Sequence, residues 1–278
     1  MPYIVNLSAI HTLHPISTNL DAFTEICNRY STGCWSGCCP SFFQSWTNYG
    51  WVAYQYNMKY QELIEPYRLG QITTDQFLAN LAAIFDFLEE SDLDQEALTD
   101  DESWVYYSNN PVYRILERAW SAGIDLDDSS RYRLPHLTSL REPVFLVSNT
   151  NELDALRILA LLKAQNPEIK FNKNIDLSIA DDKNPIKIAP NIYLCLSYRF
   201  QYFKTTEQNE SVTRPSTMSL LRYLVEFVLE AHESEIEVIS QYEGDLREAE
   251  KIGIPKANLH SADDYFSDNL APSEIIII

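Results

Sequence analysis

The sequence predicts an α/β fold in which a Rossmann-like parallel sheet carries an inserted, mostly helical cap. Three observations indicate this class. Apolar strands alternate with helices beyond residue 112, which is typical of a parallel sheet covered on both faces. A short strand at the amino terminus precedes a helical, aromatic-rich stretch over residues 20–110. Finally, 45% apolar and 22% charged residues among 278 are the composition of a globular protein, which excludes wholesale disorder.

The first strand is predicted over Tyr3–Asn6, where a short apolar run leads into a polar loop. The clearest helix of the insertion begins at Thr73, because Thr73-Thr74-Asp75-Gln76 has the form of a capping box and apolar residues then recur on one face. We therefore assign residues 1–16 and 112–278 to an α/β core domain. Residues 17–111 form the inserted helical cap domain.

The remaining elements of the core follow in chain order. Continuous apolar runs predict its strands, and helical periodicity predicts the helices between them. Gly123 and Gly253 each stand where a helix is expected to end. Residues 166–190 are expected to form an irregular insertion. The predicted strands are 143–147, 192–197 and 236–239, and the predicted helices are 112–122, 152–164, 218–230 and 245–252.

Polar residues stand at the carboxyl end of every predicted strand. Asn6 ends the first strand, Ser148 follows the second, a loop follows the third after Ser197, and Ser240 and Gln241 follow the last. Ligands of open parallel sheets bind beyond the carboxyl ends of the strands. We therefore expect these residues to surround one crevice.

The order of these pieces resembles the haloacid dehalogenase-like (HAD) hydrolase superfamily, most nearly its branch with a helical cap after the first strand. Phe145–Asn151 resembles the second family motif and Leu196–Lys204 the third. Val238–Ile254 fits the spacing of the fourth motif, and Tyr67–Thr73 precedes the cap helix that carries Phe77. The resemblance spans nearly the whole chain and implies a HAD-like fold.

The resemblance also implies an aspartate nucleophile, a second aspartate acting as general acid and base, and Mg²⁺ held between these and an acid of the fourth motif. Those positions hold Asn6, Ser8 and, by spacing from Gly253, Gln241; only Asp245, matching the second acid of the fourth motif, remains. An amide is a poor nucleophile, and neutral oxygens hold Mg²⁺ weakly. We expect degenerate catalytic positions, no metal and no other cofactor.

The phosphate side of the resemblance is retained. Ser148 matches the hydroxyl residue of the second motif, with Asn149 beside it, and Lys204 matches the lysine of the third. Ser148 precedes a predicted helix whose free amides and dipole favour an anion, although the same residue could simply cap that helix. Asn6 could likewise only hold the strand end. We expect Ser148, Asn149 and Lys204 to bind a phosphate-like or carboxylate ligand.

The charge of the chain limits its partners. With 21 Lys and Arg against 40 Asp and Glu, the formal net charge of −19 repels nucleic-acid backbones and anionic lipids. No apolar run approaches the ~18–20 residues of a membrane span, so we expect a soluble, cytoplasmic protein without a transmembrane segment. The acidic tail from Ser261 weakly resembles those of exported bacterial effectors, which leaves export as an alternative.

Other functions remain open. An active hydrolase could take its acids from elsewhere, with Asp245 as one of them. The stretches around Asp125, Asp127 and Asp86 imitate the nucleophile motif. Alternatively, the chain could be an interaction protein with an empty crevice that binds a protein partner through its aromatic cap. A zinc site is less favoured than buried thiols, because the spacing is not that of a common zinc finger. Its candidate ligands would be Cys34, Cys38, Cys39, His11 and His14.

Overall fold

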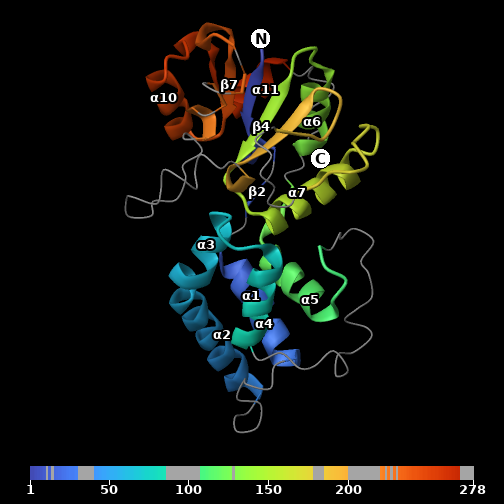
Figure 1. Ribbon diagram of the computed structural model, residues 1–278, viewed down its shortest axis with the longest axis vertical. Coiled ribbons are helices and arrows are strands. Elements are labelled where there is room, and N and C mark those ends of the chain that lie inside the picture. Colours follow the sequence, from blue (N-terminus) through green and yellow to red (C-terminus); the bar gives the residue numbers. More distant parts are fainter. Residues whose placement is uncertain are drawn as a thin grey trace. The chain divides into compact units, whose positions relative to one another are not determined.

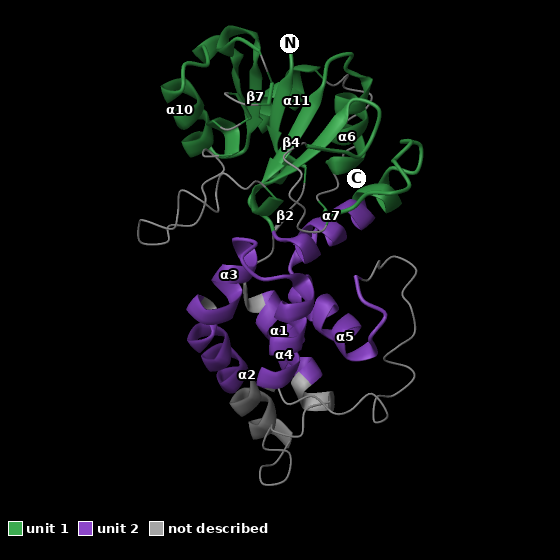
Figure 2. Cartoon of the chain, in the orientation of Figure 1, with its two compact units in different colours: residues 1–12, 126–150, 162–278 green, residues 13–125, 151–161 purple. Residues whose placement is uncertain are grey.

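The computed structural model separates, by its internal contacts, into two compact units (Figures 1 and 2). The α/β unit holds residues 1–12, 126–150 and 162–278, and the helical unit holds residues 13–125 and 151–161. The structure describes residues 1–10, 12–13, 16–30, 41–85, 107–126, 129–177, 185–199, 220–222, 224–225, 228–229 and 231–269.

A six-stranded sheet in the order β5-β6-β4-β1-β7-β8 forms the centre of the α/β unit. All neighbouring strands run parallel except β5, which pairs antiparallel with β6. Helices flank the sheet, so the predicted α/β class is confirmed. Its strands are β1 (Tyr3–Asn6), β4 (Val144–Ser148), β5 (Ile186–Lys187), β6 (Ile192–Leu196), β7 (Glu237–Ser240) and β8 (Leu259–Ser261).

The central strands are buried because their apolar side chains alternate between two covered faces. Ile4 and Val5 of β1 are at most 1% exposed, and Val144–Val147 of β4 are also buried. Short helices connect or cover these strands. They are η1 (Leu7–Ala9), α6 (Ser130–Ser139), η5 (Ser197–Arg199), η7 (Glu233–Glu235), α10 (Glu243–Lys251), η8 (Lys256–Asn258) and α11 (Ala262–Asn269).

The helical unit packs around a core of aromatic and aliphatic side chains. Helix α7 (Glu152–Gln165) crosses the division, since its residues 152–161 group with this unit and the rest with the α/β unit. A second sheet pairs β2 with β3. The other elements are β2 (Thr12–Leu13), α1 (Ile16–Tyr30), α2 (Ser41–Met58), the π-helix η2 (Tyr60–Ile64), α3 (Glu65–Arg68), α4 (Thr74–Phe85), α5 (Pro111–Trp120) and β3 (Ile124–Asp125).

Several elements agree closely with the sequence patterns. The capping box before α4 forms in both directions, because the Thr73 N–H donates to Gln76 Oε1 (3.0 Å) and the Gln76 N–H donates to Thr73 Oγ1 (3.3 Å). The boundary at residue 112 differs from the observed division. Helix α5 groups with the helical unit because Leu116, Ala119 and Trp120 pack into its core. The predicted helix 218–230 lies partly outside the described residues.

Glu117 of α5 is a buried carboxylate whose ionisation the chain around it controls. Its two oxygens accept hydrogen bonds from the backbone N–H groups of Tyr107 and Ser108, both at 2.9 Å. Burial raises the pKa of the Glu117 carboxyl from 4.5 to about 7, against the opposing effect of those N–H groups and the Arg114 guanidinium; Asp75 raises it further.

We expect wild-type protein to lose stability relative to Glu117→Gln as the pH rises. Because the folded-state pKa exceeds the unfolded value, the folded chain keeps a proton that the unfolded chain releases, and the free energy of unfolding falls between about pH 4.5 and 7. The Gln side chain does not titrate, so wild type should lose about 2–3 kcal/mol against it between pH 5 and 8. Urea unfolding at both pH values measures the difference. Equal differences at both values would contradict the prediction.

Candidate functional site

Asn6 lies at the carboxyl end of the central strand and joins two loops. Its side-chain Oδ1 accepts hydrogen bonds from the Ser8 backbone N–H (3.0 Å) and from Ser8 Oγ (2.8 Å). Its Nδ2 donates to Asp245 Oδ2 at 2.6 Å. Asn6 and Ser8 are buried, at 8% and 9% exposure. The amide therefore holds the strand end and also binds the one acid of the predicted site.

Ser240 ends the neighbouring strand β7 and binds the same carboxylate. The register pairs Val5 with Ile239, which brings the next residues, Asn6 and Ser240, side by side. The Ser240 hydroxyl donates to Asp245 Oδ2 at 2.7 Å and accepts from the Tyr242 N–H at 3.1 Å. Asp245 Oδ2 thus receives two donors, one from each strand. We call Asn6, Ser8, Ser240 and Asp245 the amide–carboxylate network.

The structure separates Gln241 from this network. Gln241 is exposed beyond the end of β7, whereas Ser240 is 1% exposed and contacts Asp245. The spacing from Gly253 alone assigned the position to Gln241. The residue that contacts Asp245 is Ser240, the last residue of β7. Spacing along the sequence could not distinguish Ser240 from its neighbour Gln241.

Ser148 and Asn149 follow β4, at the same edge of the sheet as Asn6, because Asn6 pairs with Val147. Both are half-buried, and Ser148 Oγ accepts a hydrogen bond from the Thr150 N–H at 3.2 Å. Ser148 does not cap the following helix. Asn151 does so, since its Oδ1 accepts from the Asp154 N–H at 3.0 Å.

Two backbone amides in the first turn of α7 are already bound within the protein. The Leu153 N–H donates to Tyr67 Oη at 3.2 Å, and the Asp154 N–H is bound to Asn151. Glu152 and Asp154 also place two acidic side chains in that turn. The expected attraction of a helix amino terminus for a ligand is therefore weak here, and positive charge has to come from side chains.

The third predicted anion-binding residue, Lys204, lies outside the described residues. The last described element before Lys204 is η5. It follows β6 at the carboxyl edge of the sheet, since the last residue of β6, Leu196, pairs with Ser148 at the end of β4. Ser197 and Arg199 of η5 are buried, at 1% and 7% exposure. The loop after Ser197 was expected at this edge, but Arg199 within it was not selected as a site residue.

A small open pocket borders the amide–carboxylate network. Its volume is about 240 Å³, part of which is open to solvent. Its lining residues are Ile4, Asn6, Val147, Leu221, Val238, Ile239, Ser240 and Asp245.

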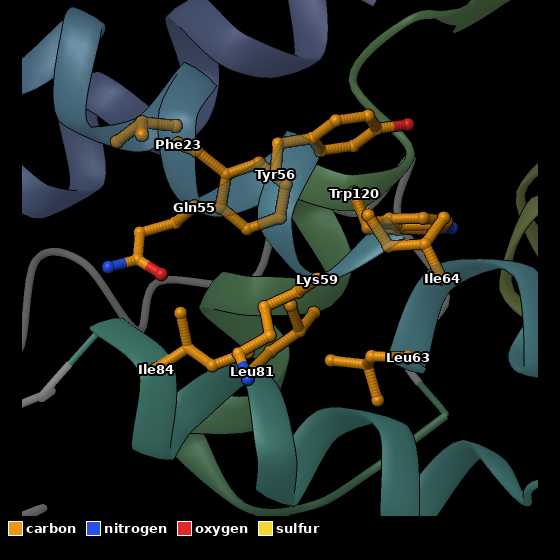
Figure 3. A pocket seen from close by; sticks show the side chains of 10 residues that line it. Phe23, Gln55, Tyr56, Lys59, Leu63, Ile64, Leu81, Ile84 and Trp120 are labelled. Carbon is orange, nitrogen blue, oxygen red and sulfur yellow. The ribbon is translucent and has the colours of Figure 1, made fainter. Parts of the chain in front are cut away.

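A second pocket, of about 330 Å³, lies within the helical unit (Figure 3). Aromatic and aliphatic side chains such as Phe23, Tyr56 and Leu81 line it. Its one charged lining residue, Lys59, already pairs with Glu62 at 2.7 Å. This pocket is an extension of the apolar core and brings no chemically reactive groups together.

The described residues at the sheet edge do not fit Mg²⁺. Proteins usually hold magnesium through one or two carboxylates, with water or substrate oxygens completing an octahedron. Here Asp245 supplies the one carboxylate of the amide–carboxylate network, and its Oδ2 already accepts hydrogen bonds from Asn6 and Ser240. Within the described ranges, no group of three His, Cys, Asp or Glu side chains could hold a metal ion.

The alternative sites receive little support from the described residues. Asp125 is exposed on β3, in the two-stranded sheet rather than the large one. Asp86 and Asp127 lie outside the described residues, as do all five candidate zinc ligands, Cys34, Cys38, Cys39, His11 and His14. Cys195 is buried in β6, and burial raises the pKa of its thiol far above the usual range.

None of the helices in the described part of the chain is long and apolar enough to cross a membrane.

Comparison with known proteins identifies the fold. No family model and no curated protein matches the chain. Among solved structures, a HAD family enzyme from Bacteroides thetaiotaomicron matches with a TM-score of 0.51 and 14% sequence identity, over 94% of this chain and 91% of that one. The chain therefore has a HAD-like fold, as the motifs predicted.

Proposed function

We propose that this HAD-like protein binds a small anion at the carboxyl edge of its sheet and does not catalyse the hydrolysis that the fold usually supports. The amide–carboxylate network carries this proposal. Asn6 and Ser8 stand where a nucleophile and a general acid would act, and they bond to each other and to Asp245. These side chains use their hydrogen-bonding groups on one another.

The chemistry of the network supports binding without turnover. A side-chain amide oxygen is neutral and already accepts two hydrogen bonds from Ser8, so it is not available as a nucleophile. Asp245 accepts from both Asn6 and Ser240. Its Oδ2 is therefore already used as an acceptor within the network.

The anion side of the proposal rests on Ser148, Asn149 and Lys204. Ser148 and Asn149 offer a hydroxyl and an amide at the end of β4, in the same row as Asn6. A lysine in the segment after β6 would add the full charge that the amides of α7 do not supply. Phosphate-like and carboxylate groups are the ligands that this donor set favours.

Thermal unfolding of the full chain tests the proposal. Inorganic phosphate or vanadate at about 100 times its dissociation constant should raise the melting temperature by about 5–10 °C, and Mg²⁺ should add nothing. Ser148→Ala should reduce the shift, whereas Ser139→Ala, an exposed serine on α6, should leave it unchanged. Potassium chloride at equal ionic strength controls for screening.

Two results would overturn the proposal. Mg²⁺-dependent release of phosphate from an aryl phosphate, abolished by Asp245→Asn, would favour an active hydrolase that uses Asp245. No response to phosphate, vanadate or a carboxylate, together with tight binding of a protein partner through the helical unit, would favour a pure interaction protein.

A further inference from the structure

Arg199 is a buried guanidinium with one neutral partner. Its Nη1 donates to the Asp176 backbone carbonyl at 2.6 Å, while its side chain is 7% exposed. Its Nε is buried and makes no hydrogen bond to the described residues. Nor does any described carboxylate form an ion pair with Arg199. It lies three residues beyond β6, at the edge of the sheet that carries the proposed anion site.

A guanidinium in this environment favours an anion. Arginine stays charged in proteins, and a buried charge is costly unless a counter-charge or several hydrogen bonds compensate it. One backbone carbonyl satisfies only Nη1. The Nε–Nη2 edge is left, and it presents two parallel N–H groups that match the two oxygens of a carboxylate or phosphate.

Ser197 adds a second unused donor in the same short helix. Its hydroxyl is buried, at 1% exposure of the residue, and has no hydrogen-bond partner within the described part of the chain. A buried hydroxyl without a partner costs on the order of a lost hydrogen bond. Both unsatisfied groups belong to η5, where β6 ends.

We propose that Arg199 and Ser197 recognise the oxyanion, with the Nε–Nη2 edge of Arg199 bound side-on to two of its oxygens. This inference rests on the proposed function and names the group that supplies its charge specificity. It predicts that the site binds anions with two oxygens on one central atom, such as carboxylate or phosphate, more tightly than a spherical halide. Helix η5 also forms two hydrogen bonds to the preceding loop: Arg199 donates to the Asp176 carbonyl, and the Tyr198 hydroxyl donates to the Leu177 carbonyl at 2.5 Å. A purely structural role for Arg199 is therefore the competing explanation.

Calorimetric titration of the full chain with inorganic phosphate, acetate and chloride tests the proposal. Phosphate or acetate should bind, and chloride should bind more weakly. Arg199→Lys keeps the positive charge but loses the two parallel N–H donors of the guanidinium. It should weaken phosphate or acetate binding about tenfold or more. Arg247→Lys, at an exposed arginine paired with Glu243, is the matched control and should bind as wild type does.

The outcomes separate this inference from the function on which it rests. If Arg199→Lys melts at the wild-type temperature without anion and binds phosphate as tightly, the inference is wrong, and a loss of binding in Ser148→Ala would still uphold the proposed function. If wild type binds neither oxyanion, both fail. Should Arg199→Lys not fold, Ser197→Ala replaces it. Weaker phosphate binding by that variant supports recognition by η5, and unchanged binding contradicts it.

Discussion

Asn6→Asp should destabilise the protein by about 3 kcal/mol at pH 8, although the substitution changes one nitrogen to oxygen. In wild type, Asn6 Nδ2 lies 2.6 Å from Asp245 Oδ2 and donates to it. In the variant two carboxylate oxygens meet there, so a hydrogen bond becomes a repulsion between like charges. Two charges at ~4 Å interact by roughly 4 kcal/mol at an effective dielectric of ~20. Urea unfolding measures the loss.

The pH dependence of the variant identifies the cause. Like-charge repulsion raises the pKa of the carboxyl pair in the folded state, so the folded variant binds a proton that the unfolded chain releases. The loss relative to wild type should therefore grow as pH rises from about 4 and level off above the raised pKa. Asn6→Ala removes the same hydrogen bonds without adding charge, and its loss should not vary with pH. A pH-independent loss in Asn6→Asp would contradict the proposed contact.

Phe77→Ala should cost about 3–5 kcal/mol of unfolding free energy, the largest effect of any substitution considered. Phe77 of α4 is fully buried, stacks on Tyr67 at 3.9 Å between ring centroids and meets the edge of Trp120 at 4.7 Å. Removal of the ring leaves a cavity. It also removes the support of Tyr67, whose hydroxyl lies 3.2 Å from Thr74 Oγ1 and accepts the Leu153 N–H.

Two substitutions calibrate this result. Phe77→Leu keeps most of the apolar volume and should cost about 1–2 kcal/mol. Tyr54→Ala removes an aromatic ring that is 59% exposed on α2 and should change stability by less than about 0.5 kcal/mol. Chemical unfolding followed by circular dichroism compares all three. A loss in Phe77→Ala no larger than in Tyr54→Ala would show that Phe77 is not at the core of the helical unit.

Much of the fold could be predicted because its signals are local. A continuous apolar run predicts a buried parallel strand wherever it occurs, which is why β1, β4, β6 and β7 were placed within one or two residues. The capping box before α4 is likewise complete within four residues. By contrast, β8 and α11 were not predicted. The stretch from Leu259 to Asn269 has mixed polarity, and its pairing with β7 depends on residues about twenty positions earlier.

The sequence identified most residues of the amide–carboxylate network but not the hydrogen bonds between them. Asn6, Ser8 and Asp245 were identified from the resemblance to the HAD motifs, and the structure brings all three together. The sequence did not show whether Ser240 or Gln241 contacts Asp245. Neighbouring residues of a strand point to opposite faces of the sheet, and which residue points to which face is fixed only when the strand pairs in a given register. Arg199 had no sequence signal, since nothing local distinguishes a buried arginine from a solvated one.

The apolar strands of the sheet, and the neutral residues Asn6 and Ser8 at and just beyond the end of the first strand, can be recognised from the sequence alone. Residue types and short periodic patterns contain that information completely. Three further facts become visible only in the folded chain: Asn6 and Ser240 share Asp245, α5 packs with the helical unit, and Arg199 is buried without a carboxylate among the described residues. Those facts depend on strand register and on burial, which arise when segments distant in sequence pack against each other.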